Sequence, residues 1–352
     1  MKNLALILIL FAFLFINPSC KKETVFIGST ELGFAPQSID ELQDFYDKGY
    51  KVIENGLRLD GQDWLENLDL LSNLEQVNGF INIQNNDNLR SLEGLDNLNY
   101  VYDKEGSPGH LSIMSNKNLM KIEGLSNLIT VESNILIAYN DKLEYCEGLN
   151  NLQEVQSLVI HSNPNLVGIG NFGNSIEFAE TIGVIRSDNL RSIDGFGTLK
   201  EIDFEFSIKD NANLETIKGF ENLMRTDKLI LSNNNKLNDI SGFGNLRIIN
   251  SILSFSENHS LVNLLDLSNI DSIGELLEIK YCQSLKNLDG LNSARLLSNQ
   301  SIITIVNNAS LTDLCAIQAL VINSGNETIY SVIGNVFNPT KYQLINGECS
   351  ND

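Results

Sequence analysis

The sequence has few of the residues that build metal centres and nucleic-acid interfaces. Three histidines and five cysteines, with no Cys-x-x-Cys pair, leave too few nitrogen and sulfur ligands in motif spacing for a zinc or iron–sulfur site. Only 24 lysines and arginines stand against 45 aspartates and glutamates, and the formal net charge of −21 would repel a nucleic-acid backbone. We therefore expect no cofactor and no nucleic-acid partner.

The first residues resemble an export signal. Lys2 precedes an apolar run of 13 residues, Leu4 to Ile16, which matches a signal-peptide core and is short for a membrane span. Ser19-Cys20 then resembles a bacterial (Bacteroidetes-type) lipoprotein signal with Cys20 lipidated. The resemblance implies a signal peptide over 1–19, a tether over 20–37, membrane attachment through the lipid only, and a place in the outer membrane at the cell surface. An ordinary secretory signal with a chance cysteine is the alternative.

From Leu57 onward the chain repeats a unit of about 24 residues, L-x-I-x-x-N-x-x-L-x-x-I-x-G-L-x-N-L-x-x-V. The alternating L-x-I segment predicts a short strand with one buried face, and stacked turns then form a parallel sheet. We count eleven turns by their anchoring leucines: Leu65, Leu89, Leu119, Leu143, Leu166, Leu190, Leu214, Leu237, Leu261, Leu285 and Leu311. The longer step from Leu89 to Leu119 predicts a loop at Asp103–His110.

Two further columns of the repeat have a predicted structural role. A glycine column before an apolar residue indicates a corner with positive φ, and Asn171 replaces glycine in one turn. An asparagine column places amides where they can bond backbone groups of adjacent turns, with Ser187 and Cys282 as replacements. The asparagines are Asn86, Asn116, Asn140, Asn163, Asn211, Asn234, Asn258 and Asn308.

The repeat resembles the receptor L-domain family, the leucine-rich solenoids of the insulin and epidermal growth factor receptors, and its bacterial surface-lipoprotein relatives. The segments 214–223 (LETIKGFENL) and 305–315 (IVNNASLTDLC) carry the resemblance, which spans about residues 50–349. It implies a mainly β fold, a right-handed leucine-rich-repeat-like parallel β-solenoid over 57–314. It also implies a binding protein that is not an enzyme, because the family shares no catalytic residues.

Each end of the solenoid needs a cap. In the N-terminal cap, 38–56, Ser38 fits a helix N-cap, and Ile39, Leu42 and Phe45 share one face of a helix over 38–48. The C-terminal cap, 315–352, contains Cys315 and Cys349, and a disulfide between them would close about 35 residues.

Several residues that could belong to a catalytic or cofactor site are explained by the repeat. The GxGxxG at 168–173 is explained by the repeat and not by dinucleotide binding. Ile169 and Phe172 occupy inward columns, and no helix pattern follows the motif. Cys146 falls in an inward apolar column and Cys282 in the asparagine column, and both are expected to be buried free thiols. The three histidines, His110, His161 and His259, are scattered and are expected to be solvated surface residues.

An acidic column precedes the corner glycine in six turns. Stacked about 4.8 Å apart, these carboxylates would form a ladder that could hold Ca²⁺ or supply a retaining glycosidase pair. We favour a solvated acidic ridge, because a uniform ladder lacks the unlike environments that separate an acid from a base. The ladder comprises Asp69, Glu93, Glu123 and Glu147, followed by Asp194 and Asp289.

The outward positions of turns two to five are the candidate ligand-binding site. Most turns carry polar outward pairs, whereas these carry apolar residues with an aromatic and a cation at the edge, the composition of an interface hot spot. The residues are Met114, Leu136, Ala138, Tyr139, Val159, His161, Ile185 and Arg186. We expect a recognition or adhesion protein that binds a protein or glycan. The alternatives are a structural or self-associating envelope component, such as a homodimer, and a carbohydrate-active β-solenoid enzyme.

Overall fold

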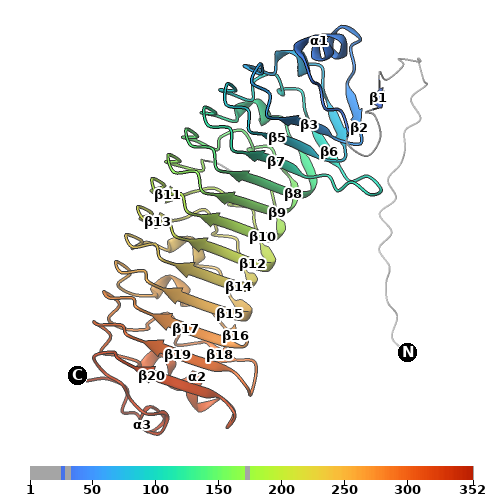
Figure 1. Cartoon of the computed structure of the whole chain (residues 1–352). Helices are drawn as coiled ribbons and strands as arrows, with labels where there is room; N and C mark the ends of the chain where they lie inside the picture. The colour runs from blue at the N-terminus through green and yellow to red at the C-terminus, as the bar shows by residue number, and fades with distance from the viewer. Residues whose placement is uncertain (1–24, 28–32, 171–174, 352) are drawn as a thin grey trace, which may run out of the picture.

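The computed structural model describes residues 25–27, 33–170 and 175–351, which form a mainly β parallel solenoid of about twelve turns (Figure 1). The expected signal peptide, Cys20 and Asn171 lie outside the described residues. Within the described residues no helix has the length and apolar composition needed to cross a membrane.

One ladder of parallel strands runs along the whole solenoid and contributes its outward side chains to one face. Its strands are β3 (Leu57–Asp60), β5 (Ile81–Gln84), β7 (Leu111–Met114), β8 (Thr130–Ala138), β9 (Glu154–His161), β10 (Phe178–Ile185), β12 (Glu201–Lys209), β14 (Arg225–Ser232), β15 (Ile248–Ser256), β17 (Leu276–Lys280), β19 (Ile302–Val306) and β20 (Ile329–Ile333).

A second, narrower ladder lies just upstream in each turn. Strands β8 to β15 of the first ladder are long enough to run through both ladders, and register shifts mark where four of their pairings bend. The strands that belong to the second ladder alone are β1 (Val25–Ile27), β2 (Val52–Glu54), β4 (Gln76–Asn78), β6 (Tyr100–Tyr102), β16 (Ser272–Ile273) and β18 (Arg295–Leu296). A small additional sheet pairs β11 (Ser192–Ile193) with β13 (Thr216–Ile217).

The remaining elements are short helices. The 3₁₀ helices η2 to η6 lie at the corners and at the C-terminal end, and three α-helices lie at the two ends of the solenoid. They are η2 (Asp69–Leu71), η3 (Glu123–Leu125), η4 (Ser241–Phe243), η5 (Leu265–Leu267), η6 (Cys315–Ile317), α1 (Ile39–Asp47), α2 (Gln318–Ile322) and α3 (Lys341–Ile345).

The core is a continuous apolar stack inside the coil. All eleven anchoring leucines are buried, as the repeat predicts, and so are the inward residues of strands β3 to β19 of the first ladder. In the middle turns four phenylalanines stack from turn to turn with ring centroids 4.7–5.8 Å apart. The chain therefore buries its apolar residues against those of neighbouring turns.

The structure adds a twelfth turn to the eleven predicted ones. Strand β20 pairs with β19 in regular parallel register, although it lies in the segment expected to be the C-terminal cap. The turn lacks an anchoring leucine, so the repeat search missed it. Asn335 nevertheless continues the asparagine column, since its side chain donates to the Ile305 carbonyl at 2.9 Å.

The asparagine column is a hydrogen-bond ladder through the interior. Asn140 is typical: its Nδ2 donates to the Ile113 carbonyl of the preceding turn at 3.0 Å, and its Oδ1 accepts the Asn116 N–H at 3.1 Å. Each buried amide thus satisfies backbone groups where the chain turns inward. Ser187 breaks the ladder, because its buried hydroxyl has no partner among the described residues.

The positive-φ prediction was incomplete. Five corner glycines, such as Gly94, have positive φ, but Gly124 and Gly242 lie in 3₁₀ helices without it. A second left-handed column directly precedes the asparagines and contains residues of many types, including Tyr139 at φ 57° and Arg186 at φ 53°. Their backbone N–H groups still donate to the next turn, so the hydrogen-bonded ladder imposes this conformation rather than the residue type.

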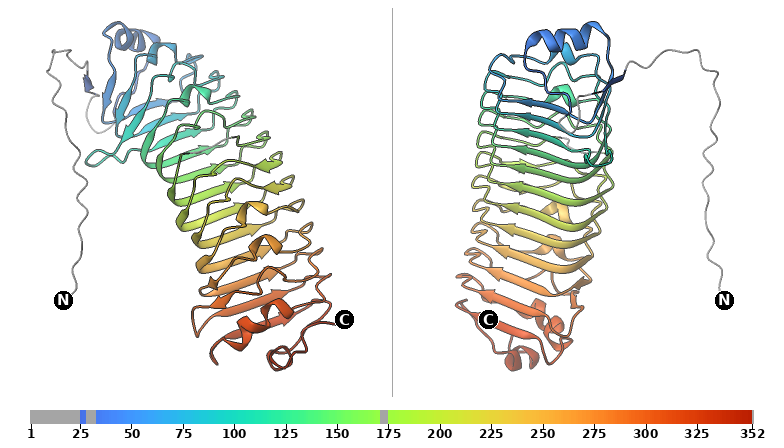
Figure 2. Two further views of the ribbon diagram at one scale, coloured as in Figure 1. Left: turned by 180° about the vertical axis from the view of Figure 1, so that it is seen from behind. Right: turned by 45° about the vertical axis from the view of Figure 1, so that its right-hand side comes forward.

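The N-terminal cap differs in detail from the prediction. Helix α1 covers the first turns, and Leu42 and Phe45 are buried as expected (Figure 2). Ile39, at the start of the same helix, is 58% exposed. The Ser38 side chain makes no capping bond; instead the Glu41 carboxylate accepts the Gln37 N–H at 3.0 Å.

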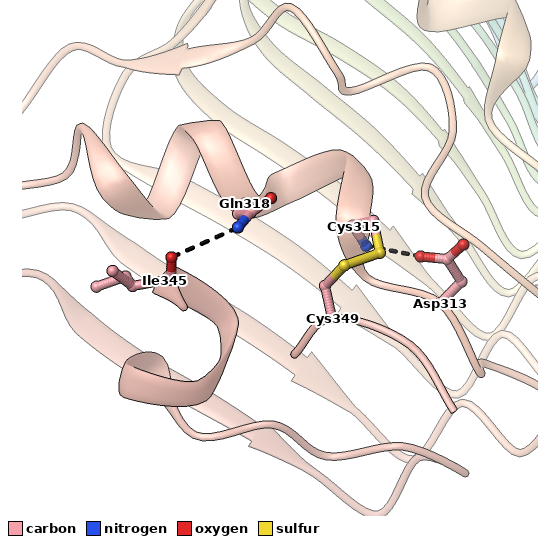
Figure 3. The surroundings of a disulfide bond; sticks show 5 residues. All are labelled: Asp313, Cys315, Gln318, Ile345 and Cys349. Carbon is pink, nitrogen blue, oxygen red and sulfur yellow. Dashed lines mark hydrogen bonds between the residues drawn. A yellow bond between two sulfur atoms is a disulfide. The ribbon is translucent and has the colours of Figure 1, made fainter. Parts of the chain in front are cut away.

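The predicted loop and disulfide are present. The Asp103–His110 segment projects as a loop between β6 and β7 (Figure 1). An antiparallel β-bridge between Lys104 and Ser107 closes the loop. Cys315 and Cys349 form a disulfide, with the Asp313 carboxylate accepting the Cys315 N–H at 2.7 Å (Figure 3). The bond links η6, which leads into α2, to the end of the chain.

Candidate binding surface

Strand register brings the predicted ligand-binding residues together on one face. Leu136 of β8 lies beside Val159 of β9, and one row further along Met114, Ala138, His161 and Ile185 follow one another across four strands. All six belong to the outward columns of the first ladder, as the two-residue alternation predicts. We call these six residues, with Tyr139 and Arg186, the sheet-face patch.

The two edge residues of the patch project beyond the strand ends. Tyr139 is 47% exposed, and the Arg186 side chain is also open to solvent. The Arg186 Nε lies 3.6 Å from an Asp210 carboxylate oxygen, an exposed ion pair that leaves most of the guanidinium free. Ala138 is buried between its neighbours, so it supports the patch without offering much contact surface.

His161 is held at the centre of the patch. Its ring meets the Tyr139 ring edge to face with centroids 5.2 Å apart, and the Ser162 hydroxyl lies 3.3 Å from its Nε2. Burial, and secondarily the positive charge of Arg186, lowers the pKa of His161. The patch therefore presents a neutral imidazole near pH 7.

The patch ends where the outward columns become polar. Beyond Val159 the column continues with Gly183 and Ser207, and beyond Ile185 it continues with Lys209. Ile230 of β14 is an isolated apolar residue in the same outward column, between Ser207 and a serine of the next turn. It offers a comparison with the contiguous patch.

A groove next to the patch was missed by the sequence reasoning. It has a volume of about 490 Å³ and lies over the first segments of β8, β9, β10 and β12, upstream of the bend. Five carboxylates and the 55% exposed Phe178 line it; the carboxylates are Glu132, Glu154, Glu177, Glu180 and Asp203. The only signal in the sequence is acidic residues beside each inward residue, and the groove itself depends on the bend between the ladders.

The acidic ladder is interrupted by a lysine. Lys121 Nζ lies 2.8 Å from a Glu93 oxygen and 3.3 Å from a Glu123 oxygen. The hydrogen bond from Lys121 lowers the pKa of Glu93, which suits an ionised surface carboxylate and not a general acid. Among the described residues no group of three or more histidine, cysteine, aspartate or glutamate side chains is placed to hold a metal ion.

Other titratable side chains are structural. Cys146 and Cys282 are buried free thiols, as predicted, and burial raises their pKa values to about 12 and about 11. The prediction of a solvated His110 was wrong, because the loop folds its ring onto Phe80 with centroids 5.8 Å apart. The His110 Nε2 lies 3.1 Å from the Asn82 Oδ1.

One family model agrees with the predicted repeat over part of the chain. Residues 51–151 match the sequence profile of the family described as receptor L domain, within the wider resemblance predicted over about 50–349. No curated protein shows a significant match. A solved leucine-rich-repeat protein of Leptospira interrogans is similar at 15% identity, over 89% of this chain and 91% of that chain, with a TM-score of 0.23. The receptor L-domain match suggests a protein-binding role.

Proposed function

We propose that the chain is a non-enzymatic recognition protein that binds a protein partner through the sheet-face patch. The contiguity of the patch carries the proposal, because four adjacent strands present apolar side chains where the other turns present mostly polar ones. An exposed aromatic and an arginine at its rim are the residue types that dominate binding energy in protein interfaces. A glycan ligand and self-association through the patch are the alternatives.

Site-specific photo-crosslinking in cells tests this proposal. A photoreactive residue at Leu136 is expected to form an adduct with a second protein, and the same residue at Ile230 is the matched control on an outward but isolated position. Adding Val159→Asp should abolish the adduct, since a charge would be desolvated in the interface. Equal adducts from both positions would contradict the site, and an adduct of two copies of this chain would favour self-association.

The lipid anchor at Cys20 and a place at the bacterial cell surface form part of the proposal. They rest on the export-signal resemblance of residues 1–20. Treating intact cells with a protease that cannot enter them tests the location, with a periplasmic protein as the leakage control. Digestion supports exposure at the surface, whereas survival with an intact control would place the protein inside the envelope and favour the structural alternative.

A further inference from the structure

The two ends of the solenoid are closed to different degrees. At the N-terminal end Phe34 forms a parallel bridge with Leu57 of β3, and α1 packs Leu42 and Phe45 against the core. The first inward residues, Leu57 and Leu59, are fully buried. At the C-terminal end β20 pairs with β19 alone, and no other strand of the described residues borders its second edge (Figure 1).

The side chains of β20 show this open edge. Ile329 is 58% exposed and Ile333 is 63% exposed. Tyr330 and Val332 fall in columns that are fully buried one turn earlier, yet both are only partly buried. A strand with no charged residue and exposed isoleucines is an edge that natural proteins usually protect.

The backbone of β20 also has groups directed to the open edge. The Ile329 N–H donates to the Ser301 carbonyl at 3.0 Å, and the Ile333 carbonyl accepts an N–H from the residue after β19 at 3.0 Å. In a parallel ladder alternate residues bond to the same neighbour. The odd-numbered residues of β20 therefore face β19, and the N–H and C=O groups of Tyr330 and Val332 point away from it.

A groove runs beside this edge. It has a volume of about 600 Å³, with β20 on one side and residues 338–341 on the other. Among the described residues no carboxylate lines the groove, and Lys341 stands at its wall, although the chain as a whole has a formal net charge of −21. The described lining of this groove thus adds no carboxylate to a contact between two copies of this acidic protein.

We propose that β20 is a dimerisation edge that pairs antiparallel with β20 of a second copy about a two-fold axis at Ser331. This register is self-complementary. The two outward-directed residues of each strand, Tyr330 and Val332, lie opposite Val332 and Tyr330 of the partner subunit and exchange four backbone hydrogen bonds with them. Ile329 meets Ile333 of the partner subunit, so the most exposed side chains of both copies cover each other.

The register gives the proposal a sharp test. Ser331 would lie opposite Ser331 of the partner subunit in a non-hydrogen-bonded pair with Cα atoms about 4.5 Å apart, within the range of a disulfide. In the full chain, purified in mild detergent, Ser331→Cys is expected to give a disulfide-linked dimer on mild oxidation. Thr304→Cys, one turn inward in the same column, is the matched control and should not crosslink. The unsubstituted chain controls for the native cysteines.

A second measurement does not depend on a new cysteine. Sedimentation equilibrium of the unsubstituted chain should show a concentration-dependent doubling of mass, which Ile329→Lys abolishes and the control Ile230→Lys retains. A monomer at all concentrations together with no Ser331→Cys crosslink overturns the proposal. A dimer that survives Ile329→Lys and does not crosslink at position 331 also overturns it, because another surface, such as the sheet-face patch, then joins the copies.

Discussion

At the scale of single residues, Ser187 is a weak position of the asparagine ladder. Ser187 is fully buried between Asn163 and Asn211, and its hydroxyl has no partner within the described part of the chain. Where an asparagine occupies this column, as Asn140 does, it bonds a carbonyl of the preceding turn and accepts a backbone N–H. The serine therefore leaves buried polar groups less satisfied than its neighbours do.

We predict that Ser187→Asn stabilises the protein. The new amide can restore the missing rung, and a buried hydrogen bond contributes about 1 kcal/mol to the free energy of unfolding. Urea denaturation followed by circular dichroism measures the change as a higher midpoint at an unchanged slope. Ser256→Asn, at an outward position of β15, is the control for the substitution itself. A midpoint equal to or below that of the original chain would show that the turn cannot accommodate the larger side chain.

From the lowered pKa values of two histidines we predict a loss of stability on mild acidification. Burial is the main cause that lowers the pKa of both His110 and His161, and the charges of Arg58 and Arg186 respectively add to it. The unfolded chain, with a histidine pKa of about 6.5, then takes up protons that the folded chain resists. The free energy of unfolding should therefore fall as the pH drops from about 7.5 through 6.5.

The pH dependence can be assigned by substitution. His110→Gln should make unfolding less sensitive to pH between about 7.5 and 5.5, measured by urea denaturation at each pH. His259→Gln replaces an exposed histidine and serves as the control. The same dependence in His110→Gln and in the original chain would mean that other groups carry the effect.

At the scale of the structural element, the corners depend on close backbone approach. A Cβ at Gly124, in η3, would lie 1.9 Å from the Leu92 carbonyl oxygen of the preceding turn. We predict that Gly124→Ala destabilises the protein by about 3 kcal/mol or more, because the backbone of two turns must separate. Gly197→Ala is the control, since apart from its chain neighbours no described residue has a heavy atom within 4 Å of the added Cβ. Similar thermal midpoints for both variants would show that the corner adapts.

The sequence predicts those elements whose residues repeat a physical requirement. Inward leucines, buried asparagines and the Asp103–His110 loop follow from spacing alone, because each position has the same surroundings in every turn. Strand β20 was not predicted, because its turn lacks the anchoring leucine. The left-handed column was not predicted for a different reason. Residues as unlike as Tyr139, Arg186 and Glu257 adopt positive φ there, so residue type gives no signal.

The candidate site shows the same limit. Period-two alternation was enough to place Leu136 and Val159 on the outward face, and the register confirms that they are neighbours. The groove beside Phe178 depends on the bend between the two ladders, which no residue type marks. The sequence repeat thus predicts which side chains face outward, whereas a groove in the surface can be located only once the path of the backbone is known.

At the scale of the whole molecule, each strand pairs only with the strands of adjacent turns, and the Lys104–Glu54 ion pair reaches across one intervening turn. Stability is therefore close to a sum over adjacent interfaces. Central turns have two neighbours, the first strand β3 is covered by Phe34, and β20 has one neighbour and an open edge. The Cys315–Cys349 bond closes the chain near that edge but adds no strand to it. Local opening should therefore require the least free energy at the C-terminal turn.

Amide hydrogen exchange provides the measurement for this last prediction. In the Ile329→Lys chain, chosen so that pairing between copies does not mask the edge, exchange should be slowest in the central strands β12 and β14. It should be faster in β20 than in β3, because the β20 amides that point outward have no acceptor among the described residues and the strand has one interface to lose. Equal protection of β3 and β20 would contradict the unequal closure of the two ends. It would indicate instead that the disulfide and residues 338–341 close the C-terminal end as completely as α1 closes the other.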